Sequence, residues 1–178
     1  MAPKLLTGAS ASMLANTCAG CHGTNGASVG PATASLAGLE EEYFVDVMNQ
    51  YKSGERFSTI MGRIAKGYSD SEIEAIAGYY GGMKFRPVRQ TSVGPKAMRG
   101  AKLHDKYCEK CHENEGREPD DIVLAGQWMP YVLWTMEDYA SGKSKVVEKK
   151  MAKALKKMLA AHGEQSLEDL THFYGSRR

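Results

Sequence analysis

The pentapeptide Cys-X-X-Cys-His occurs twice in this chain, and the two copies use all four cysteines. The first copy runs from Cys18 to His22 and the second from Cys108 to His112. In each copy two thiols can form thioether bonds to the vinyl groups of a haem, and the adjacent histidine can bind the iron. The pattern therefore predicts two covalently bound haem c groups, attached through Cys18, Cys21, Cys108 and Cys111, with His22 and His112 as axial ligands.

Three other uses of paired cysteines fit the pattern less well. One zinc shared by both motifs would need ligands 90 residues apart, which exceeds the usual spacing of zinc sites, and the two histidines would have no explanation. A redox dithiol is typical of a βαβ context, which the chain does not indicate. A disulfide within Cys-X-X-Cys closes too short a loop to constrain the fold much.

The two halves of the chain resemble each other beyond the cysteines. The segment Leu36-Ala37-Gly38 recurs as Leu124-Ala125-Gly126, and the same offset of 88 residues pairs tyrosines, methionines and a Ser-Gly step further along. Internal repetition of this extent indicates a duplicated unit. We therefore predict an N-terminal monohaem domain over residues 1–85, a linker over 86–96 that contains Pro87, Gly94 and Pro95, and a C-terminal monohaem domain over 97–178.

The periodicity of apolar residues predicts helices and no strands. Residues 10–21 and 97–111 are expected to form the helices that carry the two motifs, and residues 40–52 and 128–141 a middle helix in each half. The run from Ser69 to Glu72 is typical of a capping box at the start of a final helix, and a last helix is expected in the second half too. The predicted fold class is all-α, with two tandem domains that resemble class I cytochromes c.

A haem iron bound by one histidine needs a sixth ligand, and methionine suits electron transfer. Met61 follows His22 by 39 residues, and Met151 follows His112 by the same interval. Both fall after the middle helix, so we predict Met61 and Met151 as the second axial ligands. Met48 and Met136 also correspond between the halves, but they lie within the middle helices, where packing is the expected role of a methionine.

The remaining histidines and two prolines have simpler expected roles. His104 lies one helical turn before Cys108 and is expected to be exposed. His162 or His172 would be needed for a bis-histidine site in the second half, but neither has a counterpart in the first. Pro31 and Pro119 either form turns or orient the motif histidines through a backbone carbonyl.

Charge and hydropathy limit the partners. The formal net charge is only +2, so no nucleic-acid partner is expected, and no apolar run is long enough for a transmembrane segment. Residues 143–157 contain seven lysines and a single acidic residue, Glu148. This lysine-rich segment is either a solvated helix face or a site that steers an acidic acceptor. No signal peptide is recognisable in the first residues, yet covalent haem attachment indicates a periplasmic protein whose leader has been removed.

Two domains of about 85 residues each would have thin hydrophobic cores. A haem packed between side chains on both faces would complete such a core, so we expect the haem-free chain to be largely unfolded.

The sequence resembles the dihaem cytochrome subunit of flavocytochrome c sulfide dehydrogenase over nearly its whole length. The resemblance is carried by both motifs and by the segments at 58–68, 100–112, 124–128 and 148–152. It implies the same eight haem residues, namely Cys18, Cys21, His22 and Met61 for the first haem, and Cys108, Cys111, His112 and Met151 for the second.

The resemblance also implies a partner. In that family the cytochrome forms a heterodimer with an FAD-containing flavoprotein subunit, which oxidises sulfide and passes electrons through the haems to a soluble acceptor such as a small cytochrome c. The chain itself has no flavin-binding glycine fingerprint and no cysteine outside the motifs, so it is not expected to be an enzyme on its own. It would be the electron-transfer subunit of a sulfide dehydrogenase complex.

Two other functions compete with this one. A free-standing dihaem electron carrier that feeds a terminal oxidase would share the duplicated layout and the Leu-Ala-Gly-Gln segment. A dihaem peroxidase would need one haem without a methionine ligand, which is unexpected because both halves offer one.

Overall fold

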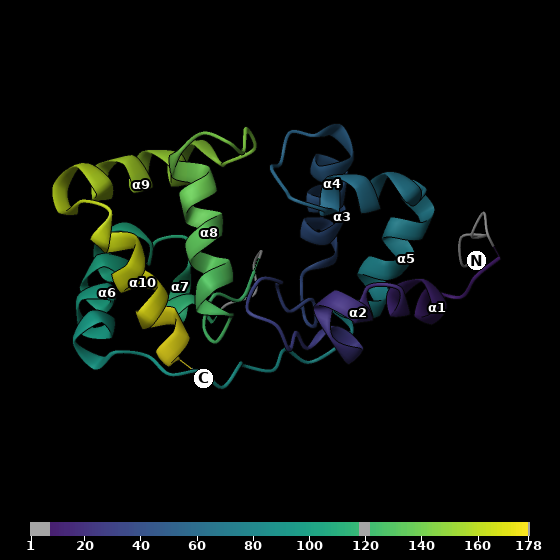
Figure 1. Cartoon of the computed structure of the whole chain (residues 1–178), viewed down its shortest axis with the longest axis horizontal. Helices are drawn as coiled ribbons and strands as arrows, with labels where there is room; N and C mark the ends of the chain where they lie inside the picture. Colours follow the sequence, from purple (N-terminus) through teal and green to yellow (C-terminus); the bar gives the residue numbers. More distant parts are fainter. Residues whose placement is uncertain (1–7, 118–121, 178) are drawn as a thin grey trace. The chain divides into compact units, whose positions relative to one another are not determined.

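The computed structural model describes residues 8–117 and 122–177, and every regular element in those ranges is a helix (Figure 1). The all-α prediction is therefore confirmed. The described chain divides into two compact units, of which unit 1 comprises residues 8–30 and 35–86 and unit 2 comprises residues 31–34, 87–117 and 122–177. No helix in these ranges combines the length and the hydropathy that are needed to cross a bilayer.

In unit 1 a short first helix packs against the last helix, and the middle helix covers the same last helix. The core is built from Leu14 of the first, Phe44 of the middle and Ile73, Ile76 and Tyr80 of the last helix, all of them buried. The elements are α1 (Ala11–Asn16), α2 (Ala19–His22), η1 (Thr24–Gly26), α3 (Glu41–Ser53), α4 (Met61–Ile64), η2 (Ala65–Gly67) and α5 (Asp70–Gly81).

Unit 2 repeats this order with longer first and fourth helices. Its first and last helices, α6 and α10, lie against each other along much of their length (Figure 1). Four helices contribute to one continuous core, which consists of Leu103, Val132, Met136, Leu155, Met158, Leu167, Leu170, Phe173 and Tyr174. The elements are α6 (Gly94–Tyr107), α7 (Glu113–Gly116), α8 (Met129–Ala140), α9 (Lys149–His162) and α10 (Gln165–Ser176).

The start of α5 has the predicted capping box. The Ser69 hydroxyl accepts from the Glu72 amide at 3.3 Å, and the Glu72 carboxylate accepts from the Ser69 amide at 2.8 Å. Two of the amides left unpaired at a helix start are satisfied in this way. The middle helices α3 and α8 also lie within one residue of their predicted ends.

The helices that precede the motifs differ from the prediction. The expected helix over 10–21 is interrupted, because the amides of Thr17 and Cys18 bond to carbonyls three residues back, at 3.1 and 3.0 Å, and so tighten the chain into a turn. The helix expected over 97–111 instead starts at Gly94 and ends at Tyr107. Both motifs therefore begin just beyond the end of a helix and form a separate short turn, which in unit 1 is the four-residue helix α2.

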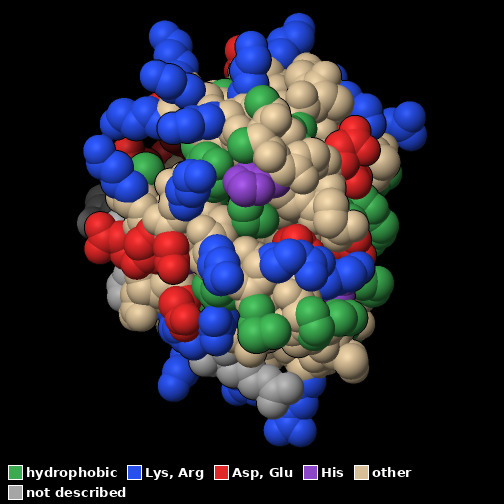
Figure 2. Space-filling model, turned by 90° about the vertical axis from the view of Figure 1, so that its left-hand side faces the viewer, with side chains coloured by type: hydrophobic (Ala, Val, Ile, Leu, Met, Phe, Trp, Pro, Cys, Tyr) green, Lys and Arg blue, Asp and Glu red, His purple; other side chains and the backbone are tan. Residues whose placement is uncertain are grey.

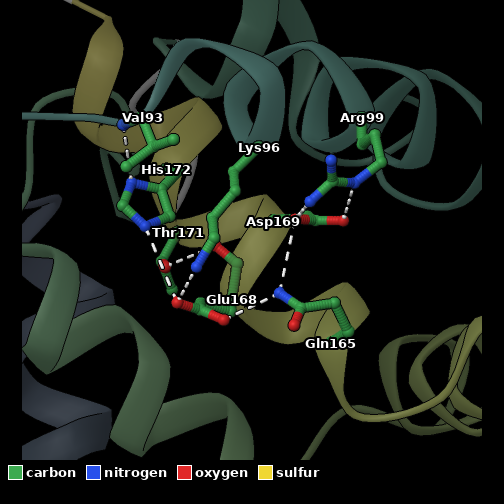
Figure 3. Close-up of polar contacts among 8 residues, drawn as sticks. All are labelled: Val93, Lys96, Arg99, Gln165, Glu168, Asp169, Thr171 and His172. Atoms are coloured by element: carbon green, nitrogen blue, oxygen red, sulfur yellow. Dashed lines mark hydrogen bonds and ion pairs between the residues drawn. The ribbon is translucent and has the colours of Figure 1, made fainter.

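The closest approach of α6 to α10 is at Gly100. A Cβ atom on Gly100 would lie 2.1 Å from the Asp169 carbonyl oxygen, so only glycine fits at this crossing. In the turn of α6 before it, polar side chains join the two helices (Figure 3). Arg99 donates to both carboxylate oxygens of the buried Asp169, at 2.7 and 2.8 Å, and Lys96 pairs with Glu168. The bidentate geometry fixes the register of α6 on α10.

Candidate haem-attachment sites

Both motifs form the same turn. In unit 1 the Cys18 carbonyl accepts from the amides of Cys21 and His22, at 3.2 and 2.9 Å. In unit 2 the Cys108 carbonyl accepts from the amides of Cys111 and His112, at 3.0 and 2.9 Å. The turn places both thiols and the imidazole of one motif within a single helical turn, which is the arrangement that a covalent haem requires.

The thiols of each motif have different surroundings. Cys18 and Cys108 are partly buried, whereas Cys21 and Cys111 are exposed, and none of the four forms a disulfide. The structure thus gives no support to the disulfide alternative. No group of three or more His, Cys, Asp or Glu side chains within residues 8–117 and 122–177 is arranged to hold a metal ion by itself.

After each motif the chain folds back in the same way. The Gly26 carbonyl accepts from the amides of Leu36 and Ala37, at 2.8 and 3.2 Å, in unit 1. The Gly116 carbonyl accepts from the amides of Leu124 and Ala125, at 2.9 and 3.0 Å, in unit 2. The repeated Leu-Ala-Gly segments thus close the loop behind each motif through these backbone hydrogen bonds, which explains why they recur in the sequence.

A tyrosine of the last helix completes each loop. The amide of Gly38 donates to the Tyr80 carbonyl, and that of Gly126 donates to the Tyr174 carbonyl, both at 2.9 Å. The tyrosine rings lie against the glycine that follows each motif, because a Cβ on Gly26 would be 2.8 Å from the Tyr80 ring. Gly26 has a φ of +71°, so glycine is required there for conformation as well as for space.

The same tyrosines contact the first cysteine of each motif. Burial raises the pKa of the Cys108 thiol to about 11, although the Tyr174 hydroxyl opposes this by hydrogen bonding to the sulfur. Burial also raises the pKa of the Cys18 thiol, where Thr17 and Tyr80 are the opposing hydrogen-bond partners. Both sulfurs are therefore neutral at neutral pH and face the protein interior. An uncharged thioether can take the place of each thiol without leaving a buried charge.

The donor set of each unit fits a haem c. Two free thiols and an imidazole lie on one turn, one sulfur faces inward, and a glycine-lined loop lies behind them. Bound haem would supply reversible one-electron chemistry. Residues of this chain would hold it and set its surroundings.

The four corresponding methionines fall into two classes. Met48 and Met136 are buried, with 4 and 6 % of their surface exposed, inside the middle helices. Met61 begins α4, Met151 lies in the first turn of α9, and both are partly buried. Met151 also packs against the core of unit 2. Met61 and Met151 are thus placed alike in the two units, each on the helix that follows the middle helix.

Helix α9 has two distinct faces. Met151, Leu155 and Met158 recur at steps of three and four residues and face the core. The exposed face carries Lys149, Lys150, Lys153, Lys156 and Lys157. None of these five lysines has an acidic partner among the residues that the structure describes. Figure 2 shows lysine and arginine side chains gathered over this helix. We call this surface the α9 lysine face.

The prediction that His104 is exposed is wrong. Its side chain is completely buried against α10, with its ring centroid 5.0 Å from that of Phe173. The repeat contained the missed signal, since Leu14 holds the same position before the first motif and is also buried. Pro119, which was one of the two candidate prolines, lies outside the described residues.

The other two histidines of unit 2 have partners of their own. His172 Nδ1 accepts a hydrogen bond from the Val93 amide at 3.1 Å and so binds the residue that precedes α6 (Figure 3). The exposed His162 lies 3.2 Å from the Tyr107 hydroxyl. These contacts weigh against a bis-histidine site in unit 2.

Comparison with known proteins gives a consistent result. The family model described as "Cytochrome C oxidase, cbb3-type, subunit III" matches residues 8–79. The cytochrome subunit of sulfide dehydrogenase from Chlorobaculum tepidum is 43 % identical over 82 residues, which are 46 % of this chain and 74 % of that protein. Cytochrome c4 from Azotobacter vinelandii is 29 % identical over 146 residues, covering 72 % of this chain and 70 % of that protein.

The fold has a counterpart among solved structures. Reduced recombinant cytochrome c4 from Pseudomonas stutzeri superposes with a TM-score of 0.79 at 22 % sequence identity, and the match covers 96 % of this chain and all of that one. This likeness confirms two tandem domains of the class I cytochrome c type.

Proposed function

The chain belongs to the family of c-type cytochromes that includes the cytochrome subunit of sulfide dehydrogenase, and on this basis we propose that it relays electrons between two proteins through one haem c in each unit. The observation that carries the proposal is the repeated site. Both units have the same motif turn, the same return of a Leu-Ala-Gly segment and the same tyrosine beside the first cysteine. The mass of the purified chain should therefore exceed that of the polypeptide by two haem groups.

The proposed ligands are Cys18, Cys21, His22 and Met61 in unit 1, and Cys108, Cys111, His112 and Met151 in unit 2. Met61→Leu and Met151→Leu should each remove one thioether ligand and leave one of two haems high-spin, because leucine cannot bind iron. Met48→Leu and Met136→Leu are matched controls, and both haems should stay low-spin in them. A fully low-spin spectrum in Met151→Leu would exclude Met151 as a ligand.

The donor of electrons is proposed to be an FAD-containing flavoprotein subunit that oxidises sulfide, with which this chain would form a periplasmic heterodimer. The similarity to the cytochrome subunit of sulfide dehydrogenase supports this partner. All four cysteines belong to the motifs, so sulfur chemistry would need a thiol from another chain. Purification from the native source should yield a second polypeptide with flavin absorbance. Reduction of the haems by sulfide should require that polypeptide.

A free-standing dihaem electron carrier is the second candidate. It is favoured by the similarity to cytochrome c4, which extends over 72 % of this chain. A chain that purifies alone and is not reduced through a flavoprotein would support the carrier. Two low-spin haems are expected in either case, so the choice depends on the partner.

The acceptor is proposed to be a soluble protein with an acidic surface, such as a small cytochrome c. The α9 lysine face could attract it, because exposed charges of one sign accelerate the encounter with a protein of opposite charge. Met151 lies on the same helix, so docking there would bring the acceptor near the second haem.

Charge reversal tests the docking surface. The triple substitution of Lys149, Lys150 and Lys156 by glutamate should slow acceptor reduction by roughly tenfold or more at low ionic strength, and much less at high salt. The matched control reverses Lys84, Arg86 and Arg89, three exposed cations outside α9, with the same change in net charge. Equal slowing in both triple variants would exclude a specific role for α9.

A further inference from the structure

Unit 2 buries an ionisable side chain at a position where unit 1 has an apolar one. His104 lies on α6 with no exposed surface, eight residues before His112. The residue eight positions before His22 is Leu14. Burial of a polar side chain is unfavourable unless it is hydrogen-bonded, so the partners of His104 indicate why the position differs between the units.

His104 connects the solvent to the haem-attaching sulfur. Its Nδ1 lies 2.9 Å from the Tyr174 hydroxyl, and its Nε2 contacts a carboxylate oxygen of Glu109, whose side chain is 44 % exposed. The Tyr174 hydroxyl is also within hydrogen-bonding reach of the Cys108 sulfur. The four groups therefore form a chain from the surface carboxylate of Glu109 to the sulfur of Cys108. We call this chain the Glu109–Cys108 relay.

The matching position in unit 1 has no such relay. Tyr80 contacts the Cys18 sulfur in the same way, but its hydroxyl donates to the Ala15 carbonyl at 2.7 Å. Ala19 stands where unit 2 has Glu109. Neither a carbonyl nor the side chains of Leu14 and Ala19 can gain a proton near neutral pH. Unit 1 is thus an internal control within the same chain.

The heavy-atom positions allow two arrangements of hydrogen. With a neutral imidazole, Nε2–H donates to Glu109, and Nδ1 accepts the hydroxyl hydrogen of Tyr174. With an imidazolium, both ring nitrogens carry hydrogen, so Nδ1–H donates to the Tyr174 oxygen. The Tyr174 hydroxyl must then turn its hydrogen away from His104, and the Cys108 sulfur is the acceptor within reach. Protonation of His104 would therefore place a hydrogen-bond donor on the sulfur that bears the haem.

Other charged groups near His104 largely balance one another. Glu115 interacts electrostatically with His104, and it pairs with Arg117 and, at 3.2 Å, with Arg177. The Arg177 guanidinium lies over the ring of Phe173, 4.5 Å from its centroid. On α10 the buried Asp169 is paired with Arg99, and on α9 the ionisable His162 contacts Tyr107. Glu109 is thus the one charged group of the described residues in direct contact with the His104 ring.

We propose that the Glu109–Cys108 relay couples proton uptake at His104 to electron uptake at the second haem. Reduction lowers the charge at the iron by one, which favours a positive charge nearby. One electron from the donor protein and one proton from bulk water are then gained together, and both are released on oxidation. The proton is held on His104 beside the Glu109 carboxylate. This inference rests on the second haem of the proposed function and is independent of which proteins are the partners.

The test is the reduction equilibrium of each haem as a function of pH, measured by redox titration of the purified haem-loaded chain without any partner. In the wild type, the equilibrium constant for reduction of one haem should rise by up to about tenfold for each pH unit lowered, somewhere between pH 5 and 8, where imidazole groups titrate. The equilibrium constant for reduction of the other haem should change much less over the same pH range. His104→Leu places in unit 2 the residue that unit 1 has at Leu14, so the reduction equilibria of the two haems should then depend on pH to the same extent.

Further variants separate the relay from a simple packing role. Glu109→Gln, at a half-exposed position, should shift the pH-dependent range to lower pH, because the imidazolium loses its carboxylate partner. Tyr174→Phe should weaken the pH dependence. His162→Gln is the matched histidine control and should leave it unchanged. Two haems per chain and low-spin spectra in each variant verify that the fold is intact.

Two results would overturn the proposal. One is a wild type in which neither haem responds to pH between 5 and 8. The other is a pH dependence that persists in folded His104→Leu, since the titrating group would then lie elsewhere, for example on a haem propionate. An unchanged response in Tyr174→Phe would exclude the hydroxyl as the connecting group. None of these results depends on sulfide, flavin or an acceptor, so the proposed partners are tested separately.

Discussion

The crossing of α6 and α10 should be very sensitive to one added methyl group. In Gly100→Ala the new Cβ would lie 2.1 Å from the Asp169 carbonyl oxygen and 2.7 Å from Phe173 Cβ. Ordinary carbon–oxygen contacts are roughly 3.3 Å or longer, so the helices would have to separate by about 1 Å. The obstacle is backbone rather than the end of a flexible side chain, so it cannot simply turn aside.

The cost follows from two opposing terms. Overpacking a core typically destabilises by about 1–3 kcal/mol, and a backbone obstacle places this site at the upper end, whereas alanine gains about 1 kcal/mol over glycine within a helix. The expected net loss in the free energy of unfolding is therefore about 2 kcal/mol for unit 2. Gly94→Ala in the same helix meets no atom within 4 Å and should change stability by less than about 0.5 kcal/mol.

The assay can isolate unit 2. Both tryptophans of the chain, Trp128 and Trp134, belong to this unit. Tryptophan fluorescence during guanidinium unfolding of the haem-loaded protein therefore follows unit 2 alone, and far-UV circular dichroism follows both units. Equal midpoints for Gly100→Ala and the wild type would refute the close contact between the helices. A loss in Gly94→Ala as large as that in Gly100→Ala would show that the helix, and not the crossing, is the sensitive feature.

Three further predictions concern single contacts and the cofactor. Tyr80→Phe should remove the 2.7 Å hydrogen bond to the Ala15 carbonyl, which keeps the Cys18 amide as a donor, and should destabilise unit 1 by about 0.5–1.5 kcal/mol, as measured by circular dichroism. The pKa of Glu168 is lowered mainly by its hydrogen bond from Lys96, so its carboxylate stabilises the fold above the pKa of the unfolded chain, and this contribution is lost as the pH falls through the folded value. Glu168→Gln should therefore reduce the loss of unit 2 stability between neutral pH and about pH 3, seen by fluorescence, and an unchanged acid profile would contradict the contact. Replacing both cysteines of one motif by alanine should remove the helical signal of that unit and leave the low-spin spectrum of the other.

Local signals in the sequence were sufficient for most of the helices. The capping box at Ser69 and Glu72 marked the start of α5 correctly, because its two hydrogen bonds are made within four consecutive residues. The interruption at Thr17 and Cys18 could not be read in this way. Helix periodicity continues through these residues, and only the hydrogen bonds of the folded chain show that the motif lies in a separate turn.

The side-chain environment of the second site could not be predicted from the sequence. Position within a helix suggested an exposed His104, but burial depends on which residue of another helix covers it, and Phe173 and Tyr174 come from the far end of the sequence. The ion pairs of Arg99 and Lys96 with α10 were missed for the same reason. Each of them joins residues that are about 70 positions apart along the chain.

The sequence by itself determined the predicted haem chemistry of this protein and its duplicated, helical plan. Haem attachment needs two thiols and an imidazole at fixed intervals along the chain, and these intervals are set by the order of the residues alone. Tertiary structure decided how the two sites differ. In unit 2 the packing of α10 on α6 buries the His104 imidazole between the Glu109 carboxylate at the surface and the Tyr174 hydroxyl. In unit 1 the corresponding packing of α5 on α1 buries Leu14 instead. Such a difference depends on contacts between distant residues, which no local pattern of amino acids specifies.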